Sequence, residues 1–130
     1  MDAILITGAT SGIGEQLAID YAKAGQEIWV CGRNQQKLDQ LAALGSHVHT
    51  LAFDITDLDQ CKKVMKNLDP VPKMWIFNAG DCEYIDNGIM DAALIKRVFD
   101  INVVGLANTI EGAQHHFSSG HRVVIVGSIA

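Results

Sequence analysis

The chain has 130 residues, of which 48% are hydrophobic and 19% charged, and its formal net charge is −5. This length suits one domain with a substantial core, and the negative charge argues against nucleic acid or an anionic membrane as the main partner. No apolar stretch approaches the length of a membrane span, and Asp2 leads at once into an apolar run, which argues against a secretory signal. The cysteines Cys31, Cys61 and Cys82 lack Cys-x-x-Cys spacing, which favours reduced thiols in the cytoplasm over disulfides or a metal site.

The first predicted strand, Ala3–Thr7, runs directly into a glycine-rich loop that leads into a helix. The loop reads Thr7-Gly8-Ala9-Thr10-Ser11-Gly12-Ile13-Gly14. Glycines let a backbone approach a pyrophosphate closely, and the free N–H groups at a helix start attract anions. The layout predicts a dinucleotide-binding loop, with a purely structural glycine turn as the alternative. No Gly-Lys-Ser/Thr follows, which argues against a P-loop NTPase.

Strand and helix patterns then alternate to the end of the chain. Further apolar runs predict strands at Glu27–Cys31, Val48–Phe53, Lys73–Phe77 and Arg122–Val126. The intervening segments predict a helix ended by Gly25, a helix ended by Gly45, a helix from the capping box at Asp57 to about Leu68, and a long helix near 91–117. Such alternation indicates an α/β doubly wound parallel sheet, a Rossmann fold with strand order 3-2-1-4-5 and helices on both faces.

Polar residues follow the predicted strands at the edge where ligands bind in such sheets. Arg33, after the second strand, suits a 2′-phosphate and favours NADP(H), with a solvated loop arginine as the alternative. Asp54-Ile55, after the third strand, offers a carboxylate to an adenine amino group or acts as a turn before the next helix. Asn78-Ala79-Gly80, after the fourth strand, lies where the chain passes the glycine loop, so we expect cofactor contact rather than a simple turn.

Two further positions carry polar groups that can act in chemistry. Gly127-Ser128 places a hydroxyl after the fifth strand, at the same rim. Asn102 lies on one helical stripe with Leu94 and Val98, where its amide needs a hydrogen-bond partner. Taken alone, this favours a packing role for Asn102.

Two histidine pairs are weak metal-site candidates. His47 and His49 share one face of a predicted edge strand, and His115-His116 lie near a helix C-terminus, where the helix dipole favours imidazolium. Neither pair has a third ligand in view, so we expect no metal site.

Together these motifs resemble the N-terminal part of the classical short-chain dehydrogenase/reductase family. The loop is similar to that family's Thr-Gly-x-x-x-Gly-x-Gly loop, and its spacing differs from the Gly-x-x-Gly-x-x-Gly of the extended branch. Asn78-Ala79-Gly80 matches the family's Asn-Ala-Gly motif, and Asp54 matches its adenine-contacting Asp. Residues 100–105 resemble the helix segment that carries the active-site Asn, and residues 122–128 resemble the strand that ends at the catalytic Ser.

The resemblance implies an oxidoreductase of the EC 1.1.1 type, which transfers a hydride between the nicotinamide of NAD(P)(H) and a carbonyl or alcohol carbon of a small molecule. Ser128 would polarise the substrate oxygen and Asn102 would hold a water in the proton relay. The cofactor-binding residues would be Gly8, Thr10, Ser11, Gly12, Ile13, Gly14, Arg33, Asp54, Ile55, Asn78, Ala79 and Gly80. NADP(H) is preferred through Arg33, but NAD(H) stays open because Ser11 stands where some NADP-dependent relatives carry a basic residue.

The family's catalytic Tyr-x-x-x-Lys motif does not occur in these 130 residues, because a glycine stands four residues after both Tyr21 and Tyr84. We therefore expect residues 1–130 to be a single dinucleotide-binding domain that ends before the catalytic Tyr and is inactive alone. The alternative is a dinucleotide-binding module without chemistry, which would need neither Asn102 nor Ser128. By analogy with relatives, we expect a homodimer or homotetramer through the helix near 91–117.

Overall fold

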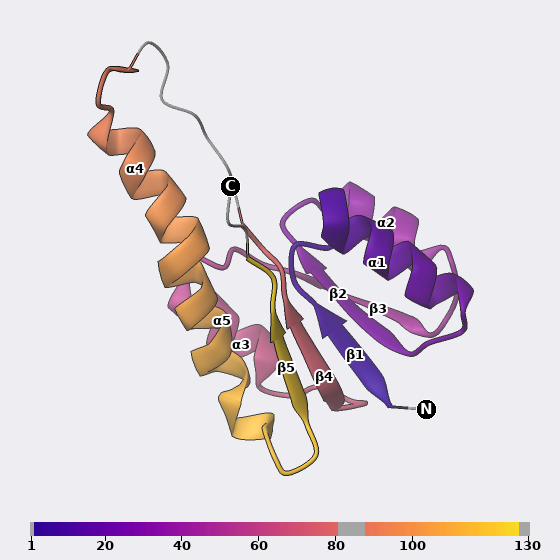
Figure 1. Ribbon diagram of the computed structural model, residues 1–130. Helices are drawn as coiled ribbons and strands as arrows, with labels where there is room; N and C mark the ends of the chain where they lie inside the picture. Colours follow the sequence, from indigo (N-terminus) through magenta and orange to yellow (C-terminus); the bar gives the residue numbers. More distant parts are fainter. Residues whose placement is uncertain (1, 81–87, 128–130) are drawn as a thin grey trace.

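The computed structural model describes residues 2–80 and 88–127, and these residues contain a five-stranded parallel sheet (Figure 1). Its strands are β1 (Ala3–Ile6), β2 (Ile28–Gly32), β3 (Val48–Ala52), β4 (Pro72–Phe77) and β5 (Arg122–Ile125). They lie in the order β3-β2-β1-β4-β5, and every neighbouring pair is parallel. The predicted doubly wound sheet is therefore confirmed. Its topological switch point, where the strand order reverses, lies between β1 and β4.

Helices cover both faces of the sheet because its strands are apolar on both sides. The helices α1 (Gly12–Lys23) and α2 (Gln35–Ala42) pack on one face, and α3 (Leu58–Met65) and α5 (Gly105–Ala113) pack on the other. Successive strand residues point to opposite faces. The first core accordingly contains Ile4, Ile6, Ala18, Val30 and Leu38, and the second contains Leu5, Cys61, Met65, Trp75 and Phe77.

The predicted capping box at Asp57 forms in part. The Asp57 carboxylate accepts a hydrogen bond from the Gln60 N–H at 3.1 Å, as expected for a helix N-cap. In a full capping box the Gln60 side chain would accept from the backbone N–H of Asp57. Here its Oε1 instead accepts from the Asp54 N–H at 3.1 Å. The third helix therefore begins as predicted, and Gln60 also fixes the turn that follows β3.

The predicted long helix near 91–117 is divided into four pieces. These are α4 (Ala92–Phe99), a π-helical segment η2 (Asp100–Val104), α5, and a 3₁₀ turn η3 (Gln114–His116). α4 extends beyond the carboxyl ends of the strands, where no described strand lies beneath it (Figure 1). Asn102 in η2 is exposed, although it shares a helical stripe with the half-buried Leu94 and Val98.

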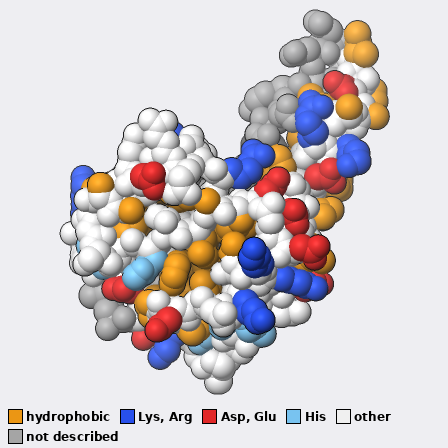
Figure 2. Space-filling model, turned by 180° about the vertical axis from the view of Figure 1, so that it is seen from behind, with side chains coloured by type: hydrophobic (Ala, Val, Ile, Leu, Met, Phe, Trp, Pro, Cys, Tyr) orange, Lys and Arg blue, Asp and Glu red, His pale blue; other side chains and the backbone are white. Residues whose placement is uncertain are grey.

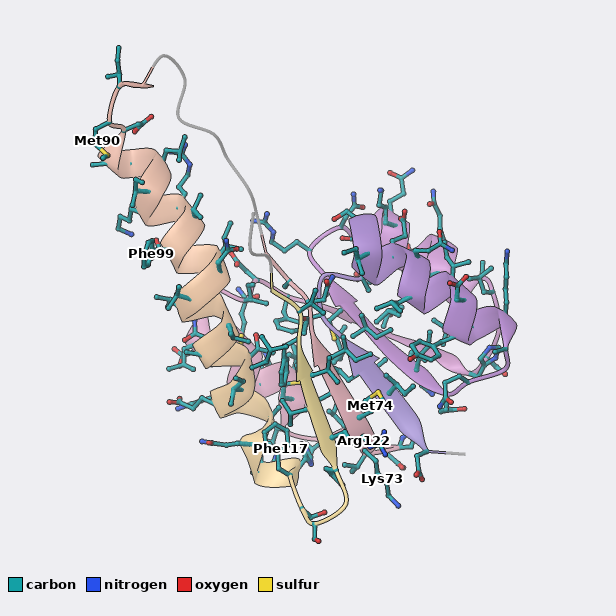
Figure 3. The ribbon with its side chains drawn as sticks, in the orientation of Figure 1. Lys73, Met74, Met90, Phe99, Phe117 and Arg122 are labelled. Carbon is teal, nitrogen blue, oxygen red and sulfur yellow. The ribbon has the colours of Figure 1, made fainter. Side chains whose placement is uncertain are left out.

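Apolar side chains reach the surface along α4 and on β5. Phe99 and Met90 point away from the sheet (Figure 3). In the view from behind, hydrophobic side chains are also visible at the protruding end of the molecule (Figure 2). Acidic and basic side chains are interspersed on the face seen in Figure 2. Within residues 2–80 and 88–127, no helix combines the length and the apolar character needed to cross a membrane.

Candidate cofactor site

The candidate site is built around Thr7, which connects the ends of β1 and β4. The Thr7 side chain is buried, and its Oγ1 accepts hydrogen bonds from the backbone N–H groups of Asn78 and Ala79, both at 3.0 Å. The Asn78 amide Nδ2 in turn donates to the Gly8 carbonyl at 3.4 Å. The loop after β1 is therefore fixed to the loop after β4 at the topological switch point of the sheet.

Two glycines are required by the close packing of this loop. Gly8 has a φ of +63°, and a Cβ there would lie 2.8 Å from the Ala79 Cα. At Gly14, a Cβ would lie 2.1 Å from the Gly8 carbonyl oxygen, so only glycine lets α1 start against the loop. The N–H groups of the first turn of α1 are thereby held at the mouth of the site, where they can bind an anion.

Thr10 packs the same loop against the end of β2. A Cβ at Gly32 would come within 2.6 Å of the Thr10 Cγ2, and the Ala9 N–H donates to the Cys31 carbonyl at 3.0 Å. The next residue, Arg33, has an exposed side chain. Because the loop is anchored to β2, the guanidinium is carried on the same rim as the start of α1.

Asp54 follows β3 and acts as a turn residue as well as a wall of the site. Its Oδ1 accepts from the Thr56 N–H at 2.9 Å and from the Thr56 hydroxyl at 2.8 Å. The backbone N–H bond of Thr56 is the main cause of the lowered pKa of Asp54, and the Thr56 hydroxyl and the Arg33 guanidinium act in the same direction. Asp54 therefore presents an ionised carboxylate at neutral pH.

Asn102 lies beside the loop that follows β4. A Cβ built at Gly80 would be 3.1 Å from the Asn102 Oδ1, so the small residue at position 80 leaves room for this side chain. Ile101, its neighbour in η2, lines the pocket. The π-helical segment thus carries Asn102 to the carboxyl edge of the sheet, and π segments occur frequently at functional sites.

These loops enclose a pocket of about 260 Å³ at the carboxyl ends of the central strands. Eight of the predicted site residues line it: Gly8, Thr10, Ser11, Arg33, Asp54, Ile55, Ala79 and Gly80. Five others lie next to it but do not line it: Gly12, Ile13, Gly14, Asn78 and Asn102. Ser128 lies outside the described residues. Five further lining residues were not among the predicted site residues: Thr7, Cys31, Gly32, Phe53 and Ile101.

A family model described as short chain dehydrogenase matches residues 2–130. The chain belongs to the short-chain dehydrogenase family. Among curated relatives, serine 3-dehydrogenase from Rhizobium radiobacter is 47% identical over 66 residues, which are 50% of this chain and 26% of that protein. The 11-beta-hydroxysteroid dehydrogenase 1A of Arabidopsis thaliana is 32% identical over 141 residues, covering 98% of this chain and 39% of that protein. The chain thus spans well under half the length of either relative.

Solved structures show the same fold. Serine dehydrogenase from Escherichia coli superposes with a TM-score of 0.87 at 21% identity, over 97% of this chain and 62% of that chain. A closed form of serine dehydrogenase complexed with NADP⁺ superposes with a TM-score of 0.89 at 21% identity, over 98% of this chain and 54% of that chain.

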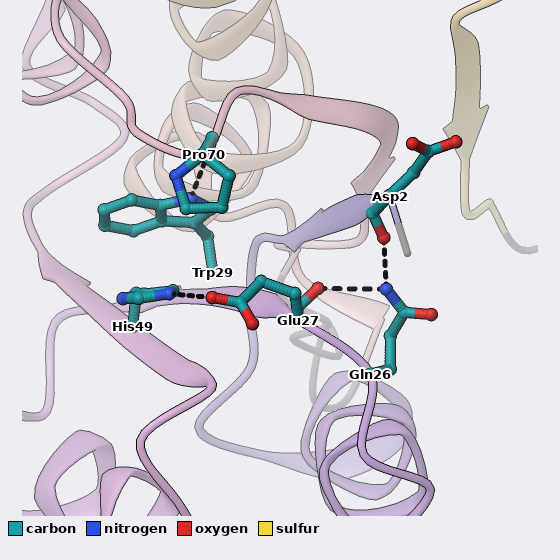
Figure 4. A network of polar contacts seen from close by, with 6 residues as sticks. All are labelled: Asp2, Gln26, Glu27, Trp29, His49 and Pro70. Carbon is teal, nitrogen blue, oxygen red and sulfur yellow. Dashed lines mark hydrogen bonds and ion pairs between the residues drawn. The ribbon is translucent and has the colours of Figure 1, made fainter.

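Three of the histidines make contacts with other groups of the chain. His49 Nε2 lies 2.6 Å from Glu27 Oε1, and its ring lies against Trp29 (Figure 4). His47 contacts the Ala22 carbonyl at 2.7 Å, and His116 contacts the Met65 carbonyl at 2.6 Å. Among the described residues, no group of three or more His, Cys, Asp or Glu side chains is placed to hold a metal ion.

The two described cysteines are free and buried. Burial raises the pKa of both thiols, that of Cys61 to about 11, so both are protonated at neutral pH. Cys31 therefore lines the pocket as a small apolar group. Cys82 lies outside the described residues.

Proposed function

We propose that this chain binds NADP(H) in the pocket above β1, β2 and β4, and that it forms the cofactor half of an oxidoreductase. The observation that carries the proposal is that two anion-binding features lie at the same pocket. The first turn of α1 supplies N–H groups for a pyrophosphate, and Arg33 supplies a guanidinium for a 2′-phosphate.

The residues of the pocket fit a dinucleotide. Apart from the chain neighbours of Gly12 and the nearby backbone of α1, no described heavy atom lies within 4 Å of a Cβ built there, so the backbone is open to close approach by a phosphate. Ser11 is the N-cap of α1 but makes no side-chain capping bond, which leaves the N–H groups of the first turn for a ligand. On the other side, the ionised carboxylate of Asp54 suits an adenine amino group.

The bound nicotinamide would supply or accept the hydride, and the substrate would be a small molecule with a carbonyl or alcohol group. Asn102, whose Oδ1 lies beside Gly80, would hold a water for proton transfer. Ser128 would donate a hydrogen bond to the substrate oxygen and so polarise it. The acid/base Tyr of the family would have to come from outside residues 1–130, since no Tyr-x-x-x-Lys occurs among them.

The NADP(H) preference is tested by titrating NADPH and NADH, with bound-nicotinamide fluorescence as the readout. A charge-assisted hydrogen bond is worth about 1.5–3 kcal/mol, so Arg33→Ala should weaken NADPH binding about tenfold or more and leave NADH within about twofold. Lys37→Ala is the matched control, because the Lys37 ammonium pairs with Glu15 at 3.6 Å. Equal affinities of the unmutated chain for NADPH and NADH would refute the preference.

We further propose that two copies associate through the helix that contains α4 and η2. Ile95, Phe99 and Val103 recur every four residues and are 37%, 58% and 52% exposed, which makes an apolar stripe on the outside of the molecule. A second copy that packs the same stripe would form a twofold interface.

The free thiols of Cys31 and Cys61 suit a reducing cytoplasm, which is the location we propose.

A further inference from the structure

Asn108 makes a long-range contact that the proposed function does not use. Its side-chain Nδ2 donates to the carbonyl oxygen of Ile55 at 2.9 Å, in a partly buried position. Asn108 lies in α5, whereas Ile55 lies in the turn between β3 and α3 and lines the pocket. The bond therefore joins one wall of the pocket to the helix that follows η2.

The side chain of the same Ile55 packs on Gly105. A Cβ at Gly105 would lie 2.7 Å from the Ile55 Cδ1 and 2.8 Å from its Cγ1, so the missing side chain of Gly105 makes the seat for Ile55. Ile55 is thus held twice by the first turn of α5, through its carbonyl by Asn108 and through its side chain by Gly105.

Gly105 also closes the π-helical segment. Its N–H donates to the carbonyl oxygen of Asp100, five residues earlier, which is the hydrogen bond that defines a π turn. A Cβ at Gly105 would lie 3.2 Å from that oxygen. Asn102 lies in the middle of η2. Gly105 therefore both packs against the Ile55 side chain and donates the hydrogen bond that closes the π turn around Asn102.

We propose that Asn108 is a positioning residue, which holds Ile55 on Gly105 and so links occupation of the Asp54–Ile55 side of the pocket to the conformation of η2 and of Asn102. The inference rests on the proposed cofactor site. A ligand shifts a conformational equilibrium only if it binds one state better. A ligand that packs on Ile55 gains that contact when Ile55 is seated on Gly105, and the Asn108 bond at 2.9 Å is the shorter of the two side-chain bonds to the Ile55 carbonyl, the other being from the Cys61 thiol at 3.7 Å.

The test is amide hydrogen exchange of the 130-residue chain, with and without adenosine 2′,5′-bisphosphate. This probe carries the adenine and the 2′-phosphate but no nicotinamide, so it does not contact Asn102 through the reacting ring. In the unmutated chain, saturating probe should slow exchange of the amides in Asp100–Gly105 about tenfold. In Asn108→Ala at saturating probe, the change should be less than about twofold.

Two further variants separate positioning from simple stabilisation. Asn108→Asp keeps the size of the side chain but has no N–H donor, so it should lose the protection as Asn108→Ala does, even if the alanine variant folds poorly. Thr109→Val is the matched control, because it removes a bond from the Thr109 hydroxyl to the Gly105 carbonyl at 2.8 Å in the same helix and leaves the side chain of Asn108 unchanged. Thr109→Val should retain the protection of η2.

Failure of the inference and failure of the proposed site give different results. If the probe binds the unmutated chain but leaves exchange of η2 unchanged, or if both Asn108 variants keep the protection, Asn108 does not position η2 and the cofactor site stands. If the probe does not bind the unmutated chain, the proposed site itself is wrong, and the positioning role falls with it.

Discussion

Replacing Thr7 by valine tests the link between β1 and β4 that organises the site. Valine has nearly the same shape, but it removes the one oxygen that accepts from the N–H groups of both Asn78 and Ala79. A partly buried donor left without a partner costs about 1–3 kcal/mol, so two such donors should lower the free energy of unfolding by about 2–6 kcal/mol. That is a large fraction of the stability of a domain, which is about 5–15 kcal/mol.

The assay is urea unfolding at equilibrium, followed by tryptophan fluorescence, with Thr109→Val as the control. Both threonines are 2% exposed, but the Thr109 hydroxyl is a donor to a helix carbonyl, so its loss leaves no N–H group unpaired. We expect Thr109→Val to cost about 1 kcal/mol or less. Equal losses in the two variants, or a loss below about 1 kcal/mol for Thr7→Val, would show that the Thr7 hydroxyl does not hold the two loops together.

Three other predictions concern the apolar stripe around Phe99, the carboxylate of Asp54 and the lack of a Tyr-x-x-x-Lys motif in residues 1–130. Phe99→Asp places a charge in the apolar stripe and should turn a dimer into a monomer in sedimentation equilibrium, whereas an unchanged mass would exclude this stripe as the interface. Because the folded-state pKa of Asp54 is lowered, its ionised form stabilises the fold above the unfolded pKa, and this contribution is lost as the pH falls through the folded-state pKa. The drop in unfolding free energy between about pH 5 and pH 2 should therefore be smaller in Asp54→Asn, and an equal drop in both proteins would contradict the assignment. Residues 1–130 alone should not reduce carbonyl compounds with NADPH, since they contain no Tyr-x-x-x-Lys, and measurable turnover would disprove this.

The sheet and its motifs were predictable because short-range signals determine them. Continuous apolar runs separated by helical patterns leave few arrangements, and the carboxyl ends of β1, β2, β3 and β4 then bring Gly8, Arg33, Asp54 and Asn78 to one edge. Their places after strands predicted Arg33 and Asp54 at this edge, but left a solvated loop arginine and a turn residue open as alternatives.

The π turn and its contacts were not predictable in the same way. Leu94 and Val98 share one stripe with Asn102, a spacing that is equally compatible with an unbroken helix, so nothing in the periodicity marks the bond from Gly105 to Asp100. The contact between Asn108 and Ile55 joins residues 53 positions apart, and no local pattern encodes such a pair. For Ile101 a signal existed, because it directly precedes Asn102, which was itself predicted as a site residue.

The most direct test of the central claim is a titration of the isotopically labelled chain with NADPH, followed by backbone amide chemical shifts. The proposed site predicts saturable shifts that are largest in the loop 8–14, at Arg33, at Asp54-Ile55 and at residues 78–80, the segments around the pocket. Saturable shifts confined to other parts of the chain, or no shifts at millimolar NADPH, would contradict a dinucleotide site at the carboxyl ends of β1, β2 and β4.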